Sequence, residues 1–355
     1  MEPAVLALAS NESYFPGLYC AVASVFSHLD AHREVDLKVL DGGISQKSRD
    51  TLSRLIDSIG GPVRLEFVPV NPSIFGKATL GPGKSHMAYC RILLPHLLDV
   101  PRLIYLDCDV LVFRNLSELF DLELSPSKVV GAVCDSETLT LGEDSQTLAE
   151  AMNLPANGEY FNSGVMLMNL SQLKHENYTE RSLDFLEAQS GNYRFHDQSA
   201  INFLLHGRIA ELPEQWNRAF WRFDEQENND LDCVVHYTGS VPWLGGIAGP
   251  AQELFERFAG EAGLPVNRSS PRFRKSVRRR LWRNGLAPLR ALAFALASLL
   301  YRFAGKKEKA AGYQRAARYW FDYIRYMPSR RQLHRRRSHE ISRMKFTLHA
   351  SPLAS

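Results

Sequence analysis

Residues 103–113 read LIYLDCDVLVF, a run that is apolar except for Asp107 and Asp109. If the run is one buried strand, the two aspartates share a face, because residues two apart on a strand point the same way. Adjacent buried carboxylates repel each other, and a divalent cation such as Mg²⁺ or Mn²⁺ removes that repulsion. The alternative is that the strand ends at Leu106 and the aspartates cap a loop, although the flanking apolar residues leave little room for a solvated loop.

Strand-like and helix-like segments alternate on both sides of this run. The strand-like segments are AVLALAS (4–10), EVDLKVL (34–40), VRLEFVPV (63–70), VVGAVCD (129–135), SGVMLMNL (163–170) and DCVVHYTG (232–239). Helical spacing is found in GLYCAVASVFSHL (17–29) and in SQKSRDTLSRLIDSIG (45–60), which starts with a Ser cap and stops at Gly60. It is also found in SHMAYCRILLPHLL (85–98), which is interrupted or kinked near Pro95. This alternation predicts an α/β fold with a mostly parallel sheet, whose ligands bind beyond the carboxyl ends of the strands.

The overall composition is that of an ordinary globular protein. The chain has 355 residues, of which 45% are hydrophobic and 23% charged. Its five cysteines show neither the CxxC spacing of a zinc site nor the pattern of a disulfide framework. The first apolar run lacks the basic start of a signal peptide, and no stretch of 18 uncharged apolar residues occurs. We therefore expect a cytoplasmic protein.

Charge is divided unevenly along the chain. Residues 268–355 carry 23 Lys and Arg against 3 Asp and Glu, whereas residues 1–267 carry 19 against 36. Such asymmetry predicts an acidic body and a basic appendage made for an anionic partner. Pro, Ser and Asn cluster where the sign changes, so we expect a body over 1–262 and a basic, amphipathic helical extension over 263–355.

Several segments in order resemble glycosyltransferase family 8, the retaining group that includes glycogenin and bacterial lipopolysaccharide galactosyl- and glucosyltransferases. RLIYLDCDVLVFRNLSELF (102–120) resembles its D-x-D segment. The other matching segments are ASNESYFPGLYCAVASV (9–25), SHMAYCRILLP (85–95), YFNSGVMLMNL (160–170), HDQSAINFLL (196–205) and HYTGSVPW (236–243). Each motif is weak alone, but their common order over about residues 4–245 is a strong signal.

The resemblance implies a nucleotide-diphospho-sugar transferase domain of the GT-A fold, with a mixed, mostly parallel sheet. It implies transfer of glucose or galactose from a UDP-sugar to a saccharide or glycolipid acceptor, as in lipopolysaccharide synthesis. It also implies Mn²⁺ or Mg²⁺ held by Asp107, Asp109 and His236. The matching motifs add Asn11, Tyr14, Cys108, Asn162, Ser163 and Gly239 for donor binding, and Arg91, Asp197 and Gln198 for catalysis.

The chain departs from the family pattern in two places. A lysine usually follows the His-Gly pair, but Gly239 is followed by SVPW. Lys84, the backbone of Gly245 and Gly246, or arginines of the extension could supply the missing diphosphate contact. Asn11 and Glu12 stand where the family usually has an aspartate near uracil. A scaffold protein that binds sugar nucleotides without turnover is therefore an alternative to an enzyme.

Each motif residue also has an ordinary structural interpretation. Arg91 could form a surface ion pair, Asn162 and Ser163 a turn, and His236 a core hydrogen bond. Asp197 and Gln198 could cap a helix. No further carboxylate suggests itself as a nucleophile, so retention favours front-face attack, with Asp197 and Gln198 orienting the sugars.

The segment RRRLWRNGLAPLRALAFALASLLYRFAG (278–305) combines a short apolar stretch with arginines. It is typical of a helix that lies in the headgroup layer of an anionic membrane. We expect residues 268–345 to attach the protein peripherally to the inner face of the cell membrane. Packing on the acidic body is the alternative. The basic charge could also bind nucleic acid, but the apolar content disfavours that partner.

Overall fold

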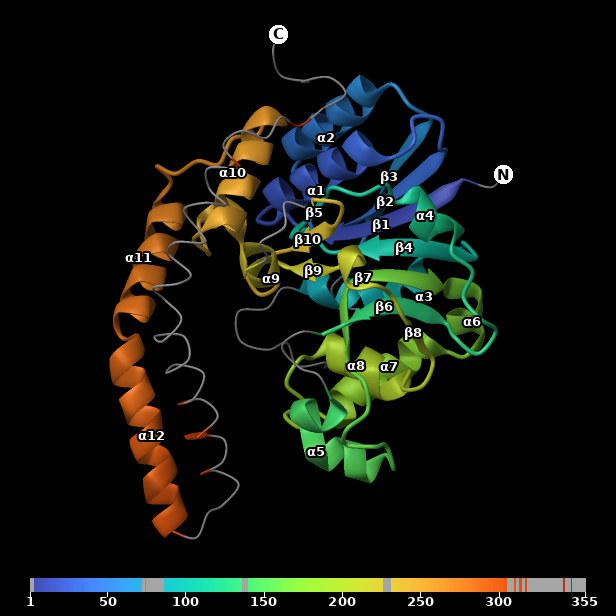
Figure 1. Cartoon of the computed structure of the whole chain (residues 1–355). Coiled ribbons are helices and arrows are strands. Elements are labelled where there is room, and N and C mark those ends of the chain that lie inside the picture. Colours follow the sequence, from blue (N-terminus) through green and yellow to red (C-terminus); the bar gives the residue numbers. More distant parts are fainter. Residues whose placement is uncertain are drawn as a thin grey trace.

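The computed structural model describes residues 3–71, 74, 86–135, 140–225, 231–304, 310, 313–314, 317, 341 and 346. Within these residues a large and a small sheet are covered by helices, and a long helical arm runs beside the body (Figure 1). The large sheet has the order β3 (Val63–Pro69), β2 (Val35–Asp41), β1 (Ala4–Ser10), β4 (Arg102–Leu106), β7 (Phe161–Asn169), β6 (Val130–Cys134) and β8 (Ile209–Glu211). Only β7 runs antiparallel to its neighbours among these strands, so the predicted mostly parallel α/β fold is confirmed.

Strand β1 has apolar residues on both faces because both faces of the sheet are covered. Leu6 and Leu8 belong to a core layer that includes α1 (Phe15–His28). Ala7 and Ala9 belong to the opposite layer, which includes α3 (Cys90–Leu97). The predicted interruption at Pro95 is not found, because α3 continues through Pro95 to Leu97; the segment instead divides at Cys90, where a 3-10 turn, η2 (His86–Tyr89), precedes α3.

The D-x-D run is not one strand, so that interpretation is wrong, and the alternative in which the strand ends at Leu106 is confirmed. Strand β4 ends at Leu106 in the large sheet, and β5 (Val110–Val112) begins in the small sheet. The small sheet has the order β5, β10 (Val234–His236) and β9 (Arg218–Ala219). The turn between β4 and β5 is held by backbone bonds, since the Asp107 amide donates to the Gly164 carbonyl over 2.8 Å. The aspartates are therefore fixed at the junction of the two sheets.

The remaining elements surround these sheets. They are α2 (Gln46–Ile59), α4 (Ser117–Asp121), α5 (Leu141–Ala151), α6 (Leu170–His175), α7 (Tyr178–Ala188), α8 (Asp197–Leu204), α9 (Phe220–Glu225), α10 (Pro250–Glu261) and the 3-10 turns η3 (Glu214–Trp216) and η4 (Pro242–Leu244). As predicted, α2 begins after a Ser cap: the Ser45 side chain accepts from the Ser48 amide. It stops at Gly60, whose φ of 69° suits glycine.

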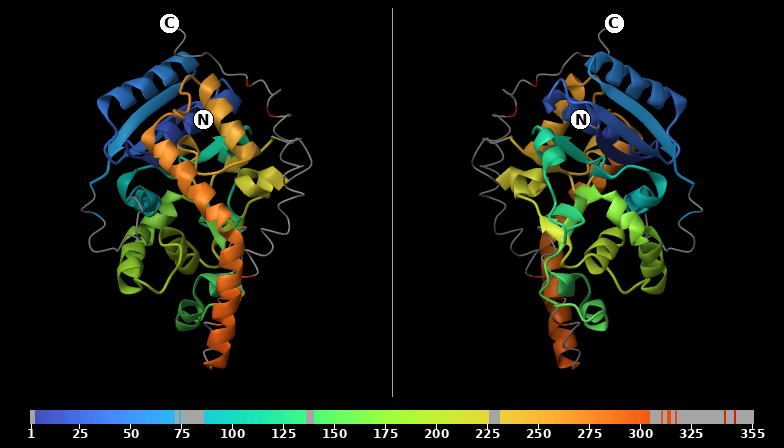
Figure 2. Two further views of the ribbon diagram at one scale, coloured as in Figure 1. Left: turned by 90° about the vertical axis from the view of Figure 1, so that its left-hand side faces the viewer. Right: turned by 90° about the vertical axis from the view of Figure 1, so that its right-hand side faces the viewer.

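The arm consists of α11 (Pro271–Gly285) and α12 (Ala287–Phe303). Figures 1 and 2 show α12 extending away from the body while α11 lies near it. Near η4, Phe273 and Val277 of α11 lie close against Gly245. Farther along the chain, Phe346 stacks on Phe113. No helix among the described residues is both long and apolar enough to cross a membrane. The domain boundary at residue 263 stays a prediction.

Candidate active site

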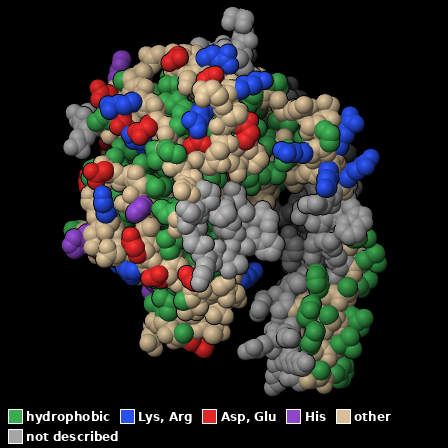
Figure 3. Space-filling view, turned by 180° about the vertical axis from the view of Figure 1, so that it is seen from behind, with side chains coloured by type: hydrophobic (Ala, Val, Ile, Leu, Met, Phe, Trp, Pro, Cys, Tyr) green, Lys and Arg blue, Asp and Glu red, His purple; other side chains and the backbone are tan. Residues whose placement is uncertain are grey.

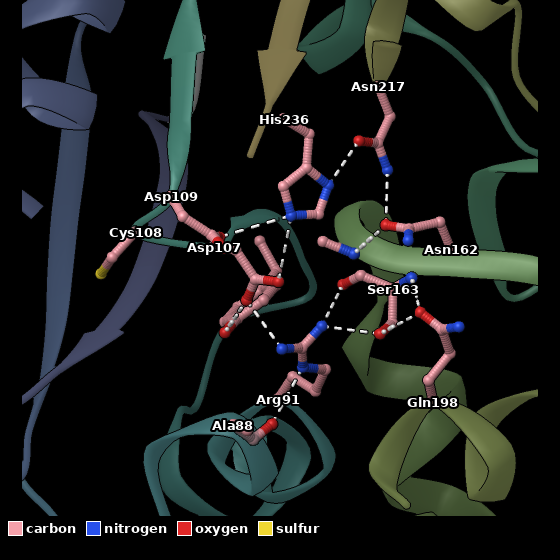
Figure 4. A network of polar contacts seen from close by, with 12 residues as sticks. Ala88, Arg91, Asp107, Cys108, Asp109, Asn162, Ser163, Gln198, Asn217 and His236 are labelled. Atoms are coloured by element: carbon pink, nitrogen blue, oxygen red, sulfur yellow. Dashed lines mark hydrogen bonds and ion pairs between the residues drawn. The ribbon is translucent and has the colours of Figure 1, made fainter. Parts of the chain in front are cut away.

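Three potential metal ligands meet where the two sheets join (Figure 4). In the small sheet His236 pairs with Val110, which places the ring beside Asp109. His236 Nε2 lies 3.3 Å from Asp109 Oδ1 and 3.8 Å from Asp107 Oδ2. One ligand atom from each of the three residues lies within 4.8 Å of the others. This cluster is a possible site for one divalent cation.

Two hydrogen bonds fix the Asp107 carboxylate. Its Oδ1 atom accepts from Arg91 Nη2 over 2.7 Å and from the Tyr105 hydroxyl over 2.9 Å. Its Oδ2 atom is the oxygen that faces His236. Arginine and tyrosine therefore orient the carboxylate so that one oxygen is directed into the cluster.

The electrostatics of the cluster also suit a cation. Burial raises the pKa of the Asp109 carboxyl, although His236 opposes this. Burial would lower the pKa of His236, but Asp109 and Asp107 raise it above its usual value. Positive charge is therefore stabilised at this position. Two carboxylates and an imidazole are ligands that Mn²⁺ accepts, and carboxylates suit Mg²⁺, so the donor set fits the predicted ions.

Arg91 connects this cluster to the neighbouring elements, and the interpretation as a surface ion pair is wrong because the residue is 5% exposed. Its Nε atom lies 3.0 Å from Asp197 Oδ2. Its Nη1 atom donates to the carbonyl and the hydroxyl of Ser163, over 2.7 and 2.6 Å. Asp197 is the first residue of α8 and is 4% exposed. The arginine thus joins α3, the turn after β4, β7 and α8 in one network.

Asn162 and Ser163 lie in β7 rather than in a turn, at the point where the pairing of β7 with β6 shifts register between Ala132 and Val133. The Gln198 Oε1 atom accepts from the amide and hydroxyl of Ser163, over 3.1 and 3.2 Å. Gln198 Nε2 and Asn162 Nδ2 both donate to Asp135 Oδ2, over 3.0 and 3.1 Å. Asn162 Oδ1 accepts from Asn217 Nδ2 over 2.8 Å. Sequence motifs from β7 and α8 therefore converge, and they include two residues that the motifs did not indicate, Asp135 and Asn217.

The N-terminal motif, with Asn11 and Tyr14, lies near the cluster of Asp107, Asp109 and His236. Asn11 Oδ1 accepts from the backbone amides of Ser13 and Tyr14, which shapes the turn before α1. Burial raises the pKa of the Tyr14 hydroxyl, with Asp109 and Asp107 adding to the effect. The Tyr14 ring lies edge-on to Trp243, with centroids 5.4 Å apart.

Other residues that were considered for contacts with the sugar nucleotide lie outside this network. The Cys108 thiol donates to the Ala9 carbonyl over 3.1 Å and points away from the carboxylates, so only its backbone faces the cluster (Figure 4). Glu12 accepts from the Ser45 amide over 2.8 Å and so supports the start of α2. Gly239 lies in the turn after β10 with a φ of 67°. Lys84, proposed as a substitute for the missing lysine, lies outside the described residues.

A pocket of about 430 Å³ opens next to the polar network. Its lining includes Asp135, Asn162 and Asn217 of that network, together with Glu211, Trp221 and Arg222. Carboxylates, amides and an indole ring in one pocket are the groups with which proteins hold saccharides, through hydroxyl hydrogen bonds and ring contact.

This fold is that of a GT-A glycosyltransferase. An active-site mutant of LgtC superposes with a TM-score of 0.61 at 26% identity, over 72% of this chain and 95% of that one. The galactosyltransferase LgtC in complex with donor and acceptor sugar analogs gives 0.60 at 26% identity, over 77% and 99%. Residues 5–245 match the family model for glycosyl transferase family 8, which is more than half of the chain. The chain therefore belongs to glycosyltransferase family 8, as its motifs predict.

The chain is also similar to curated relatives. General stress protein A of Bacillus subtilis is 28% identical over 265 residues, which cover 69% of this chain and 89% of the relative. The lipopolysaccharide 1,2-glucosyltransferase of Escherichia coli K12 is 28% identical over 191 residues, covering 51% of this chain and 54% of the relative. The chain thus spans about half the length of that glucosyltransferase.

Gly164 is a further residue that the motif contains but sequence reasoning did not single out. A side-chain carbon at this position would lie 2.1 Å from His236 Cε1. No atom fits at that separation, so the glycine makes room for the imidazole ring. Asn217 had no detectable signal in the sequence, since it lies in the short segment before β9 with no motif around it.

Proposed function

We propose that this protein is a metal-dependent, retaining hexosyltransferase. It uses UDP-glucose or UDP-galactose and transfers the hexose to a saccharide or glycolipid in the synthesis of cell-surface polysaccharide or lipopolysaccharide. The convergence of Asp107, Asp109 and His236 beside a polar pocket carries this proposal. The similar galactosyltransferase LgtC and the similar lipopolysaccharide glucosyltransferase support the choice of substrates.

In this proposal Asp107, Asp109 and His236 hold Mn²⁺ or Mg²⁺. The bound ion stabilises the negative charge that grows on the departing diphosphate. Arg91 and Tyr105 keep the Asp107 carboxylate in position through their bonds to Oδ1. Tyr14, Trp243 and the turn at Asn11 line the side where the nucleotide base and ribose lie.

The residues near the sugar favour front-face attack over a carboxylate nucleophile. Asp197 is bound to Arg91 and is 4% exposed, and Asp135 accepts two hydrogen bonds from Asn162 and Gln198. These bonds suit groups that orient sugar hydroxyls. The bond from the anomeric carbon to the UDP oxygen breaks while a bond to the acceptor oxygen forms on the same face. The acceptor proton passes to the departing diphosphate, which leaves as UDP.

The acceptor saccharide occupies the pocket that contains Trp221 and Arg222. This pocket adjoins Asp135 and Asn162, the residues placed here beside the donor sugar. Trp221 offers a ring face, and Glu211 offers a hydrogen-bond acceptor for hydroxyl groups.

Release of UDP tests this function and separates an enzyme from an inactive binding protein. A panel of UDP-sugars is incubated with the full chain and Mn²⁺, and free UDP is measured. We expect UDP-glucose or UDP-galactose to give the fastest release and excess chelator to stop it. Binding of UDP without release from any UDP-sugar would favour the scaffold alternative and contradict the proposed activity.

We further propose that the arm attaches the enzyme to the inner face of the cell membrane, where lipid-linked acceptors are available. Six apolar side chains of α12 are 50–83% exposed: Leu289, Leu292, Leu296, Leu299, Leu300 and Phe303. Figure 3 shows hydrophobic side chains along α12. Other side chains of α12 contact residues that follow it in the chain: Ser298 donates to the Ala310 carbonyl, and Tyr301 stacks on Tyr313.

Charge selects an anionic membrane as the partner of this surface. The neighbouring helix α11 exposes Arg272, Arg274, Lys275 and Arg278. Each basic residue near an anionic surface adds about 1 kcal/mol of attraction. Apolar insertion by α12 and attraction by α11 therefore act together.

Vesicle flotation tests the attachment, and point variants are needed because Ile341 and Phe346 pack on the body. Wild-type protein is expected to float with vesicles that contain phosphatidylglycerol and much less with neutral vesicles. Leu292→Ser combined with Leu296→Ser should reduce flotation, whereas Leu122→Ser, at an exposed leucine of the body, should not. Flotation of the double variant at the wild-type level would contradict the attachment. Salt-dependent binding to duplex DNA without vesicle binding would favour the nucleic-acid alternative.

A further inference from the structure

A buried asparagine lies behind the imidazole of the metal cluster (Figure 4). Asn217 is 7% exposed and precedes β9, the strand that pairs with the His236 strand. Its Oδ1 atom lies 2.8 Å from His236 Nδ1. The opposite ring nitrogen, Nε2, faces Asp107 and Asp109. Asn217 thus contacts the ring on the side away from the carboxylates.

The orientation of the Asn217 amide follows from a backbone group. The Gly164 amide is an N–H donor, and its partner over 2.9 Å is the Asn162 side chain. The Asn162 atom at that position must therefore be the carbonyl oxygen. The same oxygen contacts Asn217, so Asn217 must present its NH₂ group there. The Asn217 oxygen then faces His236, and the ring must donate from Nδ1.

The next contact along the chain of amides is consistent with this orientation. The NH₂ group of Asn162 contacts Asp135 Oδ2 over 3.1 Å, and a carboxylate accepts such a bond. Gln198 also presents its NH₂ group to Asp135, while its oxygen accepts from the Ser163 amide. Each side-chain amide in the network therefore has one orientation that satisfies its neighbours. A continuous chain of hydrogen bonds therefore runs from His236 through Asn217 and Asn162 to the Asp135 carboxylate.

We propose that Asn217 is a positioning residue that holds the His236 proton on Nδ1 and so directs the Nε2 lone pair at the cation. The inference rests on the proposed metal-dependent function and adds a residue to it. Histidines that bind metals generally donate their second ring nitrogen to such a partner, which fixes the tautomer and the ring orientation. Loss of the partner commonly weakens metal affinity by a factor of about 10 to 100.

The chemistry of the two ends of Asn217 suggests informative variants. Asn217→Leu keeps a similar volume but removes both the acceptor for His236 and the donor for Asn162. Asn217→Asp keeps the acceptor for His236, while its second oxygen opposes Asn162 Oδ1 and breaks that contact. The aspartate variant should therefore rescue metal binding without restoring the amide chain. Asn169→Ala removes an asparagine that caps α6 and is the matched control.

The experiment measures the affinity of the full chain for Mn²⁺ alone, from the loss of the free-ion signal in electron paramagnetic resonance. We expect Asn217→Leu to weaken Mn²⁺ binding about tenfold, and Asn217→Asp to remain within about threefold of wild type. Asn169→Ala should bind Mn²⁺ as wild type does. Asn217→Ala also removes the acceptor for His236, but it leaves a cavity where Asn217→Leu places an apolar side chain. We expect it to weaken Mn²⁺ binding about tenfold as well. If one of the two variants fails to fold, the other still provides the test.

The outcomes separate this proposal from the proposed function. If wild type binds Mn²⁺ and the Leu and Ala variants bind it equally well, the positioning role is overturned and the metal site stands. If Asn217→Leu and Asn217→Asp weaken Mn²⁺ binding equally, the positioning role is also overturned. Only the aspartate keeps a hydrogen-bond acceptor for His236, and that acceptor would then have no effect on metal affinity. If wild type binds no Mn²⁺ with or without UDP, the metal-dependent function and this proposal both fail.

Discussion

The imidazole of His236 lies 3.3 Å from the carboxylate of Asp109, although 127 positions separate the two residues in the sequence. Antiparallel pairing of β10 with β5 brings them together, because His236 lies opposite Val110. A backbone hydrogen bond also joins the two segments, since the Tyr237 amide donates to the Asp109 carbonyl over 2.8 Å. The cluster therefore depends on strand register rather than on a flexible loop.

Asp109→Asn should remove most metal binding and activity. The amide keeps the shape of the side chain but loses the charge that faces His236 and that would bind the proposed cation. We expect kcat for UDP release to fall by a factor of about 10² to 10³. Asp99→Asn changes an exposed carboxylate that pairs with Lys174 on the surface and should leave activity unchanged. Full activity of the Asp109 variant would contradict the assignment of Asp109 as a metal ligand.

Gly164→Ala should displace the His236 ring. The added carbon would lie 2.1 Å from the ring, so either the imidazole or β7 must move. Overpacking of this kind costs about 1 to 3 kcal/mol of unfolding free energy, and Mn²⁺ affinity should fall with it. Gly260→Ala in α10 is the control, because an added carbon there meets no atom within 4 Å. Unchanged Mn²⁺ affinity in the Gly164 variant would contradict the close approach.

Arg91→Met should destabilise the protein as well as inactivate it. The change leaves Asp197 and Asp107 without their buried cation. Removing one partner of a buried ion pair typically costs about 3 to 5 kcal/mol, which urea unfolding of the variant measures. Arg222→Met affects an arginine that is about half exposed, with a pairing distance of 3.4 Å, and should cost less than about 1 kcal/mol. Similar losses in both variants would show that burial of Arg91 is unimportant.

Glu12 should contribute stability that depends on pH. The Ser45 amide lowers the pKa of the Glu12 carboxyl below its usual value. A lowered folded-state pKa gives stabilisation that is present above the unfolded-state pKa of about 4.3 and is lost as pH falls through the folded-state value. The Tm difference between wild type and Glu12→Gln should therefore shrink when the pH is lowered from about 7 to about 3. A difference that is independent of pH would contradict this.

Much of the fold was predictable because its signals are local. The alternation of apolar strands and amphipathic helices identified the α/β fold, and the Ser45 cap and Gly60 stop identified α2. The break between β4 and β5 was not predictable from composition, because both strands are buried and apolar and their assignment to different sheets is a tertiary property. The aspartates converge through the sheet junction and not through the two-residue period of one strand.

The candidate site was predictable where residues belong to motifs and unpredictable where they support them. His236 and Arg91 stand in recognisable segments, and the structure brings both to Asp107. Asn217 and Asp135 make their contacts over separations of 19 and 63 residues, from segments without a motif. Glu12 stood in a matching segment, but its carboxylate binds the start of α2. Contacts of this kind depend on packing between distant segments.

The central claim is that one cation is held by Asp107, Asp109 and His236. Anomalous diffraction at the manganese edge, from crystals of the full chain grown with Mn²⁺ and UDP, tests it most directly. We expect a single strong peak in bonding contact with Asp109, with His236 and with the Asp107 oxygen that faces the ring. A peak that avoids these three side chains, or UDP bound with no peak beside its phosphates, would contradict it.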